Sequence, residues 1–215
     1  MSMICYVKPM KTLAIDIETY SSVDIKEAGV YAYVDAPDFE ILLIAYRFDN
    51  EVTVIDIHGY HREAAINYLE TFYPDFWEGL NDPEVIKTAF NANFERTALA
   101  RYFNRSMPPE QWKCTAVHAA TLGLPRSLGD VGTALHLPQD KQKDKIGKSL
   151  IDYFCKPCKP TKKNGGRTRN LPEHDKEKWE LFIEYNRQDV IAEQAILERL
   201  RPYPVTEEEQ KLWNF

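Results

Sequence analysis

Carboxylate side chains stand at three places in the sequence where apolar segments end or begin. The first place is the apolar segment Lys11–Ile17, which contains Asp16 next to its end and is followed directly by Glu18. In an extended strand these two acids lie on one face, opposite the larger apolar residues. Two like charges on one face repel each other and lose solvation, and a bound cation such as Mg²⁺ or Mn²⁺ removes that penalty. A strand end that emerges into water is the alternative for such a pair.

The second place is a long helix expected from about Glu173 to Leu200. At about 100° per residue its apolar side chains form one stripe, and Tyr185 and Asp189 lie one turn apart on a shoulder of that stripe. A carboxylate at this rim is positioned to meet the acids of the strand. An ordinary polar residue at the boundary with solvent is the alternative for Asp189 taken by itself.

The third place is Asn91-Ala92-Asn93-Phe94-Glu95, directly after the expected strand Val85–Phe90. An Asn at a strand–helix junction usually forms a turn or caps the helix, and an acid in the first turn usually interacts with the helix dipole. These ordinary roles are the alternative to a site that uses Asn91 and Glu95.

Taken in order, the three groups resemble the DnaQ-like superfamily of 3′→5′ exonucleases, in particular the subgroup with four acids and a tyrosine, often called DEDDy. The similarity extends from Lys11 to about Leu200. Asp16-Ile17-Glu18-Thr19 and Tyr185-Asn186-Arg187-Gln188-Asp189-Val190 are the specific motifs. The middle motif is looser, because Glu95 stands where the family usually has Asp. Gly29-Val30-Tyr31-Ala32-Tyr33 is more similar to the proofreading domain of family A DNA polymerases, particularly phage-type ones, than to free-standing RNA exonucleases.

This resemblance implies a mechanism with two divalent ions, Mg²⁺ or Mn²⁺. Asp16 would bridge both ions, Glu18 and Asp189 would complete the first, and Glu95 would hold or orient the second. Tyr185 would orient the attacking water, since a phenol with an ordinary pKa of about 10 is a poor base. Single-stranded DNA would be shortened from its 3′ end to nucleoside 5′-monophosphates. The resemblance also assigns contacts with the terminal nucleotide to Thr19, Asn91 and Phe94.

The elements that must position these residues predict an α/β fold, a mixed central sheet with helices on both faces. The resemblance implies that this sheet is of the RNase H-like or DnaQ-like type. Beyond the elements already named, strands are expected at Glu40–Phe48, Glu51–His58 and Gln111–Cys114, with Asp49-Asn50 as a hairpin turn, and helices at Arg62–Phe72, Phe94–Phe103, Val117–Leu122 and Leu128–Leu135. Asp75 and Asp82, which flank Trp77, are expected in a surface loop. We expect an exonuclease domain over residues 1–204.

A basic loop insertion is expected over residues 139–172. From Gln139 to Asn170 there are ten Lys or Arg residues against three Asp, although the whole chain has a net charge of −6. Such a segment is either a solvated loop or an arm that follows the phosphates of a nucleic acid. Cys155 and Cys158 in the same segment are half of a zinc site, with no second Cys-x-x-Cys in the chain.

The overall composition is that of a folded domain, with 44% hydrophobic and 28% charged residues. Four cysteines in 215 residues do not form a disulfide framework, which favours a reducing cytoplasm. The resemblance implies that this is the cytoplasm of a bacterial host or phage-infected cell. The longest apolar run, Ile41–Tyr46, is too short to cross a bilayer, so no membrane partner is expected.

Residues 205–215 are expected to begin a following segment, the start of a connection to a polymerase domain. Thr206 and Glu209 have the spacing of a helix capping box, and Leu212 and Trp213 then begin an apolar face without a partner of its own. A tail that packs back on its own domain is the alternative. For the whole chain, an RNA 3′ exonuclease of the RNase D type and a catalytically weak DNA-holding module remain alternatives to a proofreading exonuclease.

Overall fold

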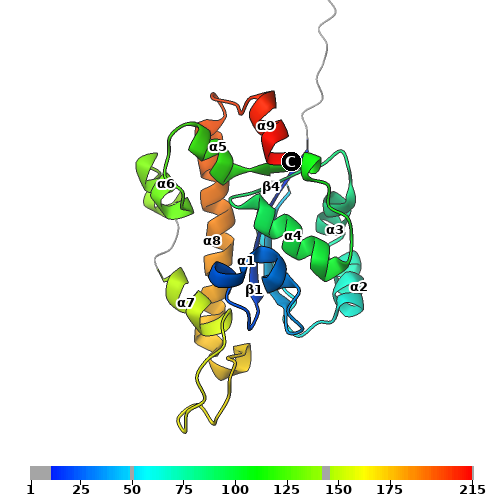
Figure 1. The fold of residues 1–215 in the computed structure, drawn as a ribbon, viewed down its shortest axis with the longest axis vertical. Helices are drawn as coiled ribbons and strands as arrows, with labels where there is room; N and C mark the ends of the chain where they lie inside the picture. The colour runs from blue at the N-terminus through cyan, green and yellow to red at the C-terminus, as the bar shows by residue number, and fades with distance from the viewer. Residues whose placement is uncertain (1–10, 49–50, 142–145, 215) are drawn as a thin grey trace, which may run out of the picture.

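The computed structural model describes residues 11–48, 51–141 and 146–214. A mixed sheet lies at the centre, with the strand order β3-β2-β1-β4-β5 (Figure 1). β1 pairs antiparallel with β2 and parallel with β4, so β1 joins the hairpin half of the sheet to the parallel half. The strands are β1 Thr12–Tyr20, β2 Glu40–Arg47, β3 Val52–Asp56, β4 Ile86–Ala89 and β5 Trp112–Cys114.

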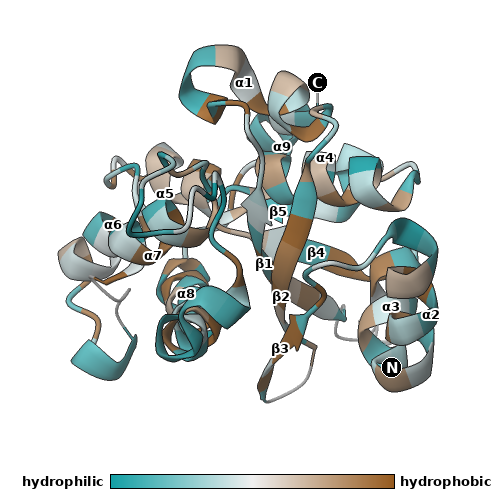
Figure 2. Ribbon diagram, turned by 90° about the horizontal axis from the view of Figure 1, so that it is seen from below, coloured by the Kyte–Doolittle hydropathy of each residue, from teal (hydrophilic) through white to brown (hydrophobic). Residues whose placement is uncertain are grey.

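Helices cover both faces of this sheet, as predicted. Helices α2, α3 and α4 pack on one face, and the long helix α8 crosses the other, with α5, α6 and α7 beside it (Figures 1 and 2). The helices are α1 Ile25–Val34, α2 Arg62–Phe72, α3 Pro74–Asn81, α4 Ala92–Phe103, α5 Thr115–Thr121, α6 Leu128–Ala134, α7 Gly147–Phe154, α8 Lys176–Leu200 and α9 Glu207–Asn214.

The alternation of side chains along β1 divides the core between the two faces. Leu13, Ile15 and Ile17 belong to the large hydrophobic cluster under α2, α3 and α4. Ala14 faces the other way and packs with Val190 of α8. The small alanine lets α8 approach the sheet closely, so acids on the same face of β1 lie under the same helix.

Two helices lie where the sequence indicated a loop or gave no element. The expected surface loop around Trp77 is helix α3, in which Trp77 is buried and Asp75 accepts hydrogen bonds from the Tyr46 hydroxyl. Pro74 begins this helix, where its missing N–H costs nothing. Helix α1 covers the Gly29–Tyr33 segment and is kinked at Gly29, whose φ of 79° gives the segment no simple helical period.

The part of the basic insertion from residue 146 onward is also more ordered than its composition indicated, because it contains helix α7 and a hydrogen-bonded loop. The expected turn Asp49-Asn50 lies outside the described residues.

Helix α9 begins as the capping box predicted. The Glu209 N–H donates to Thr206 Oγ1, and the Thr206 N–H donates to Glu209 Oε2. The expectation that the apolar residues of this tail have no partner is wrong for Trp213, which packs against the large cluster, although Leu212 is 77% exposed. In the part of the chain that the structure describes, no helix combines the length and apolarity needed to cross a membrane.

Candidate active site

Three carboxylates from two elements come together between β1 and α8. Asp16 and Glu18 of β1 and Asp189 of α8 each offer an oxygen, and these oxygens lie within 4.8 Å of one another. Glu18 and Asp189 are buried and Asp16 is half-buried. Carboxylate oxygens gathered in this way are the donors that Mg²⁺ and Mn²⁺ prefer, so the donor set fits a hard divalent cation. Among the described residues this is the one group of His, Cys, Asp or Glu with such geometry.

Asn186 of α8 fixes the position of Asp16. Its side-chain amide donates to Asp16 Oδ2 at 2.7 Å and to the Asp16 carbonyl at 3.3 Å. A neutral donor can orient a carboxylate without neutralising it, and so leaves its charge available to a cation. Asn186 stands inside the motif Tyr185–Val190, but no role was predicted for it from the sequence. The available signal is that Asn186 adjoins Tyr185 in the motif. In the structure its amide is fully buried, and a buried amide needs a polar partner.

Tyr185 and Asp189 lie on the buried face of α8, not on its shoulder as the helical wheel indicated. That prediction assumed that α8 packs on one side only, whereas α8 packs against the sheet and also against α5, α6 and α7. Burial and the neighbouring carboxylates, Asp189 first, raise the pKa of Tyr185 above its ordinary value. The phenol therefore stays protonated and can donate a hydrogen bond.

Gly147, at the start of α7, lies directly against the Tyr185 ring. A Cβ atom built on Gly147 would stand 1.9 Å from the nearest ring carbon. Only glycine allows the two helices to hold the ring at this position. This contact could not be predicted from the sequence, because a glycine inside a Lys-rich segment gives no local signal of what it packs against.

Glu95 and Glu193 are two further buried carboxylates near the cluster. Burial, and next the charge of Asp16, raise the pKa of Glu95 above its usual range. Glu95 Oε2 is buried without a hydrogen-bond partner among the described residues. Glu193 lies one turn after Asp189 on α8, and burial raises its pKa as well. It accepts hydrogen bonds from Thr115 Oγ1 at 2.5 Å and Gln194 Nε2 at 2.7 Å.

The residues expected to contact a terminal nucleotide lie on two elements. Thr19 is buried at the end of β1, and its hydroxyl is 2.8 Å from the Tyr33 hydroxyl of α1. Phe94 of α4 contacts the same tyrosine, with ring centroids 6.1 Å apart. Asn91 is the exposed N-cap residue of α4, and its side chain makes no capping hydrogen bond. Tyr33 therefore connects the last residues of β1 with the first turn of α4.

The two cysteines of the basic insertion have separate surroundings. Cys155 is buried, and its thiol lies 3.7 Å from Glu18 Oε2. Burial, then the charge of Glu18, raises the pKa of the Cys155 thiol. The thiol of Cys158 instead lies 3.4 Å from the Arg167 carbonyl. Neither cysteine belongs to a metal-binding group within the described ranges.

Comparison with curated proteins finds a relative that is similar along most of this chain. The chain is 56% identical over 206 residues to a DNA polymerase of Bacillus phage SP02. That match covers 95% of this chain but 30% of the polymerase, so the chain spans under a third of that relative. No family model matches the chain.

Among solved structures, the chain shares its fold with nucleases. It is 17% identical to Trypanosoma brucei RNase D in a complex with GMP, with a TM-score of 0.54, over 94% of this chain and 55% of that one. It is 16% identical to Brucella melitensis NrnC, with a TM-score of 0.50, over 96% of this chain and 82% of that one. At these identities the likeness establishes the fold, an RNase H-like mixed α/β sheet.

Proposed function

We propose that the chain is a metal-dependent 3′→5′ exonuclease that hydrolyses the 3′ ends of single-stranded DNA to nucleoside 5′-monophosphates. The observation that carries this proposal is the meeting of Asp16, Glu18 and Asp189 within 4.8 Å, with Tyr185 one turn before Asp189 on α8. Four residues of one ordered motif set thus lie at one place, although they are far apart in sequence.

The three carboxylates, together with Glu95, would hold the divalent cations. When bound, such cations supply a more acidic water and stabilise charge on the leaving oxygen. Glu95 fits this role because it carries a buried oxygen without a partner among the described residues, and a buried carboxylate of this kind is costly unless a ligand uses it.

Tyr185 would orient the attacking water rather than remove its proton. Its raised pKa keeps the hydroxyl protonated, so the hydroxyl is a donor and a positioning group. Thr19, Asn91 and Phe94 would contact the terminal nucleotide, with Thr19 and Phe94 both held by Tyr33.

The similarity to the DNA polymerase of Bacillus phage SP02 supports a role in DNA replication. Because this chain corresponds to 30% of a DNA polymerase, we propose that it removes mispaired 3′ ends for a family A polymerase domain that is covalently linked or associated with it. Residues 1–204 would form the exonuclease domain, and residues 205–215 would begin the connection.

The test is digestion of 5′-labelled single-stranded DNA and a matched RNA, with Mg²⁺, with Mn²⁺ and with a chelator. We expect shortening from the 3′ end of DNA that the chelator abolishes. Asp16→Ala should lower the rate by at least about 10²–10³-fold, since one preorganised charge-stabilising contact contributes that much. Glu184→Ala, which removes an exposed acid of α8 that lies outside the cluster, is the control. Wild-type digestion by folded Asp16→Ala protein would contradict the site, and digestion of RNA only would favour an RNase D-type enzyme.

A further inference from the structure

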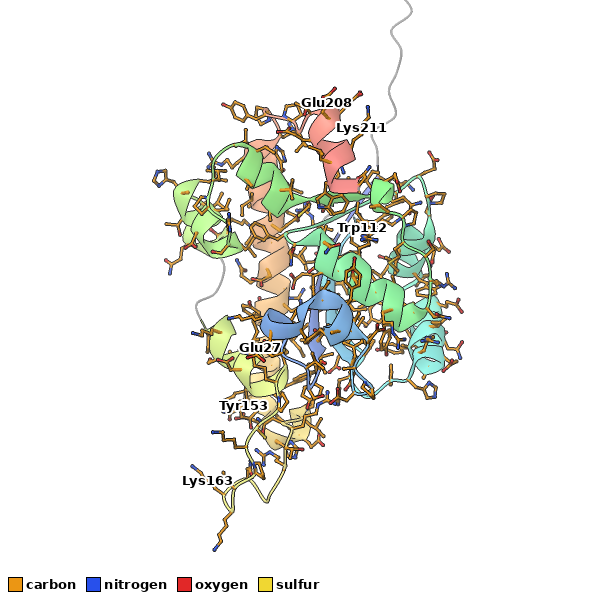
Figure 3. All side chains as sticks on the ribbon, viewed as in Figure 1. Glu27, Trp112, Tyr153, Lys163, Glu208 and Lys211 are labelled. Atoms are coloured by element: carbon orange, nitrogen blue, oxygen red, sulfur yellow. The ribbon has the colours of Figure 1, made fainter. Side chains whose placement is uncertain are left out.

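A positively charged loop, residues 156–169, projects from the body of the molecule below α7 and α8 (Figure 3). We call it the basic finger. It contains six Lys or Arg residues and no acid, in a chain whose net charge is −6. Lys163 lies at its tip and points away from the protein (Figure 3). A concentration of one charge on a protein of opposite charge creates a local field for a ligand of the other sign.

Internal hydrogen bonds give the finger a defined shape. Asn164 is their centre: its side-chain oxygen accepts from the Thr161 and Gly166 N–H groups, and its amide donates to the carbonyls of Lys159 and Arg167. The Cys158 N–H donates across the finger to the Thr168 carbonyl at 2.7 Å. These bonds define the backbone path from which the finger's cationic side chains project.

The root of the finger is fixed beside the candidate active site. The Arg169 guanidinium pairs with Glu40 of β2 and lies 3.7 Å from the centre of the Tyr20 ring, at the end of β1. On the other side of the root, the Cys155 thiol lies 3.7 Å from Glu18. The finger therefore starts where the strand with Asp16 and Glu18 ends.

The cations of the finger divide into two groups. Arg169 anchors the root, Arg167 donates to Asn170 Oδ1 at 2.8 Å, and Lys156 pairs with Asp152 of α7. The remaining three are exposed and make no ion pair within the described residues; they are Lys159, Lys162 and Lys163. The first group builds the finger, and the second offers three ammonium groups to a ligand.

We propose that the basic finger holds the sugar-phosphate backbone of the single strand whose 3′ end lies at the acid cluster. This inference rests on the proposed function for the place of the 3′ end. Eight residues from root to tip span at most about 26–29 Å, which corresponds to roughly eight nucleotides at the stacked spacing of about 3.4 Å. The finger then contacts phosphates several nucleotides away from the scissile bond, without preference for base or for DNA over RNA.

The first experiment measures binding of a 15-nucleotide DNA and a 15-nucleotide RNA, by fluorescence anisotropy with EDTA present, from 50 to 200 mM salt. In the finger variant Lys159, Lys162 and Lys163 are all replaced by Gln. We expect its log–log salt slope to be shallower by about 2 for both strands, since each lost contact removes about 0.7. The control replaces Lys113, Arg126 and Lys211, three exposed cations outside the finger, by Gln. Equal slopes for the two triple variants would overturn the proposal.

The second experiment compares hydrolysis of the 15-nucleotide DNA with that of a trinucleotide. The wild type should prefer the longer strand, as judged by the ratio of the two kcat/KM values, and the finger variant should lose that preference. An unchanged ratio would overturn the proposal. If the wild type hydrolyses neither strand while the salt slopes still differ, the proposed function fails and the finger remains a nucleic-acid contact.

Discussion

Asp189 and Glu193 stand one turn apart on α8 and are equally buried, with 4% and 3% of their surfaces exposed, but they face different neighbours. Asp189 faces Asp16 and Glu18, whose oxygens lie within 4.8 Å of its own. Glu193 faces hydroxyl and amide donors, Thr115 and Gln194, which satisfy it within the protein. Burial alone thus does not identify a metal-binding acid. The difference is that mutual repulsion leaves the first group in need of a cation, whereas neutral donors already stabilise the second.

The largest expected effect comes from exchanging each of these acids for its amide. Asp189→Asn should lower kcat by about 10²–10³-fold, because it removes a carboxylate from the cluster. Glu193→Gln should stay within about tenfold of the wild type, since a single hydrogen bond contributes only roughly 0.5–1.5 kcal/mol. Single-turnover rates on 5′-labelled single-stranded DNA measure both.

Equal losses in the two variants would remove the distinction between the acids. In that case Glu193 would belong to the catalytic group, and the cluster of three would be incomplete. A large loss of kcat in Glu193→Gln, with the wild-type kcat in Asp189→Asn, would reverse the assignment.

The contact of Gly147 with Tyr185 allows a second comparison, between two helical glycines. Gly147→Ala should shift the Tyr185 ring, which a new Cβ would approach to 1.9 Å, at a cost of about 1–3 kcal/mol for overpacking. Gly132→Ala is the control, because its nearest atom would be an ordinary 3.6 Å away. Thermal unfolding and kcat are the measurements.

We expect a melting temperature lower by several degrees and a lower kcat for Gly147→Ala. For Gly132→Ala we expect a change of at most about 1 kcal/mol, in the stabilising direction. If both variants have the melting temperature and the kcat of the wild type, the position of the Tyr185 ring does not depend on this packing.

The sequence predicted best those features that depend on local pattern. The alternation along β1 and the capping box at Thr206 follow from period and residue type, and both are confirmed by the packing of Ala14 and by the hydrogen bonds of Glu209. The long helix α8 was found for the same reason, since its apolar residues recur over many turns.

The features that the sequence did not predict depend on contacts between distant segments. Nothing local indicates that Gly147 meets a ring 38 positions later in the chain, or that Asn186 holds Asp16. The helical wheel failed for Tyr185 because it assumed one packed face, while α8 is covered on more than one side. The loop expected around Trp77 failed because a short helix of eight residues shows little periodicity.

The smallest effect is a pH dependence of stability at Glu193. Its pKa is raised in the folded protein, chiefly by burial, so the folded state binds the proton more tightly than the unfolded state does. The group therefore weakens the fold as the pH rises above its ordinary pKa of about 4.5 and through its raised folded value, by at most about 1.4 kcal/mol per pH unit. Glu193→Gln, which has no proton to lose, should remove that decline.

Urea unfolding at several pH values from 4 upward measures this decline in stability, with Glu198→Gln as the control for loss of one exposed charge on α8. The stability of Glu193→Gln relative to the wild type should increase as the pH rises. If the two Gln variants instead run parallel at every pH, Glu193 is not held in a protonated form by its surroundings, and the contrast with Asp189 would rest on hydrogen bonding alone.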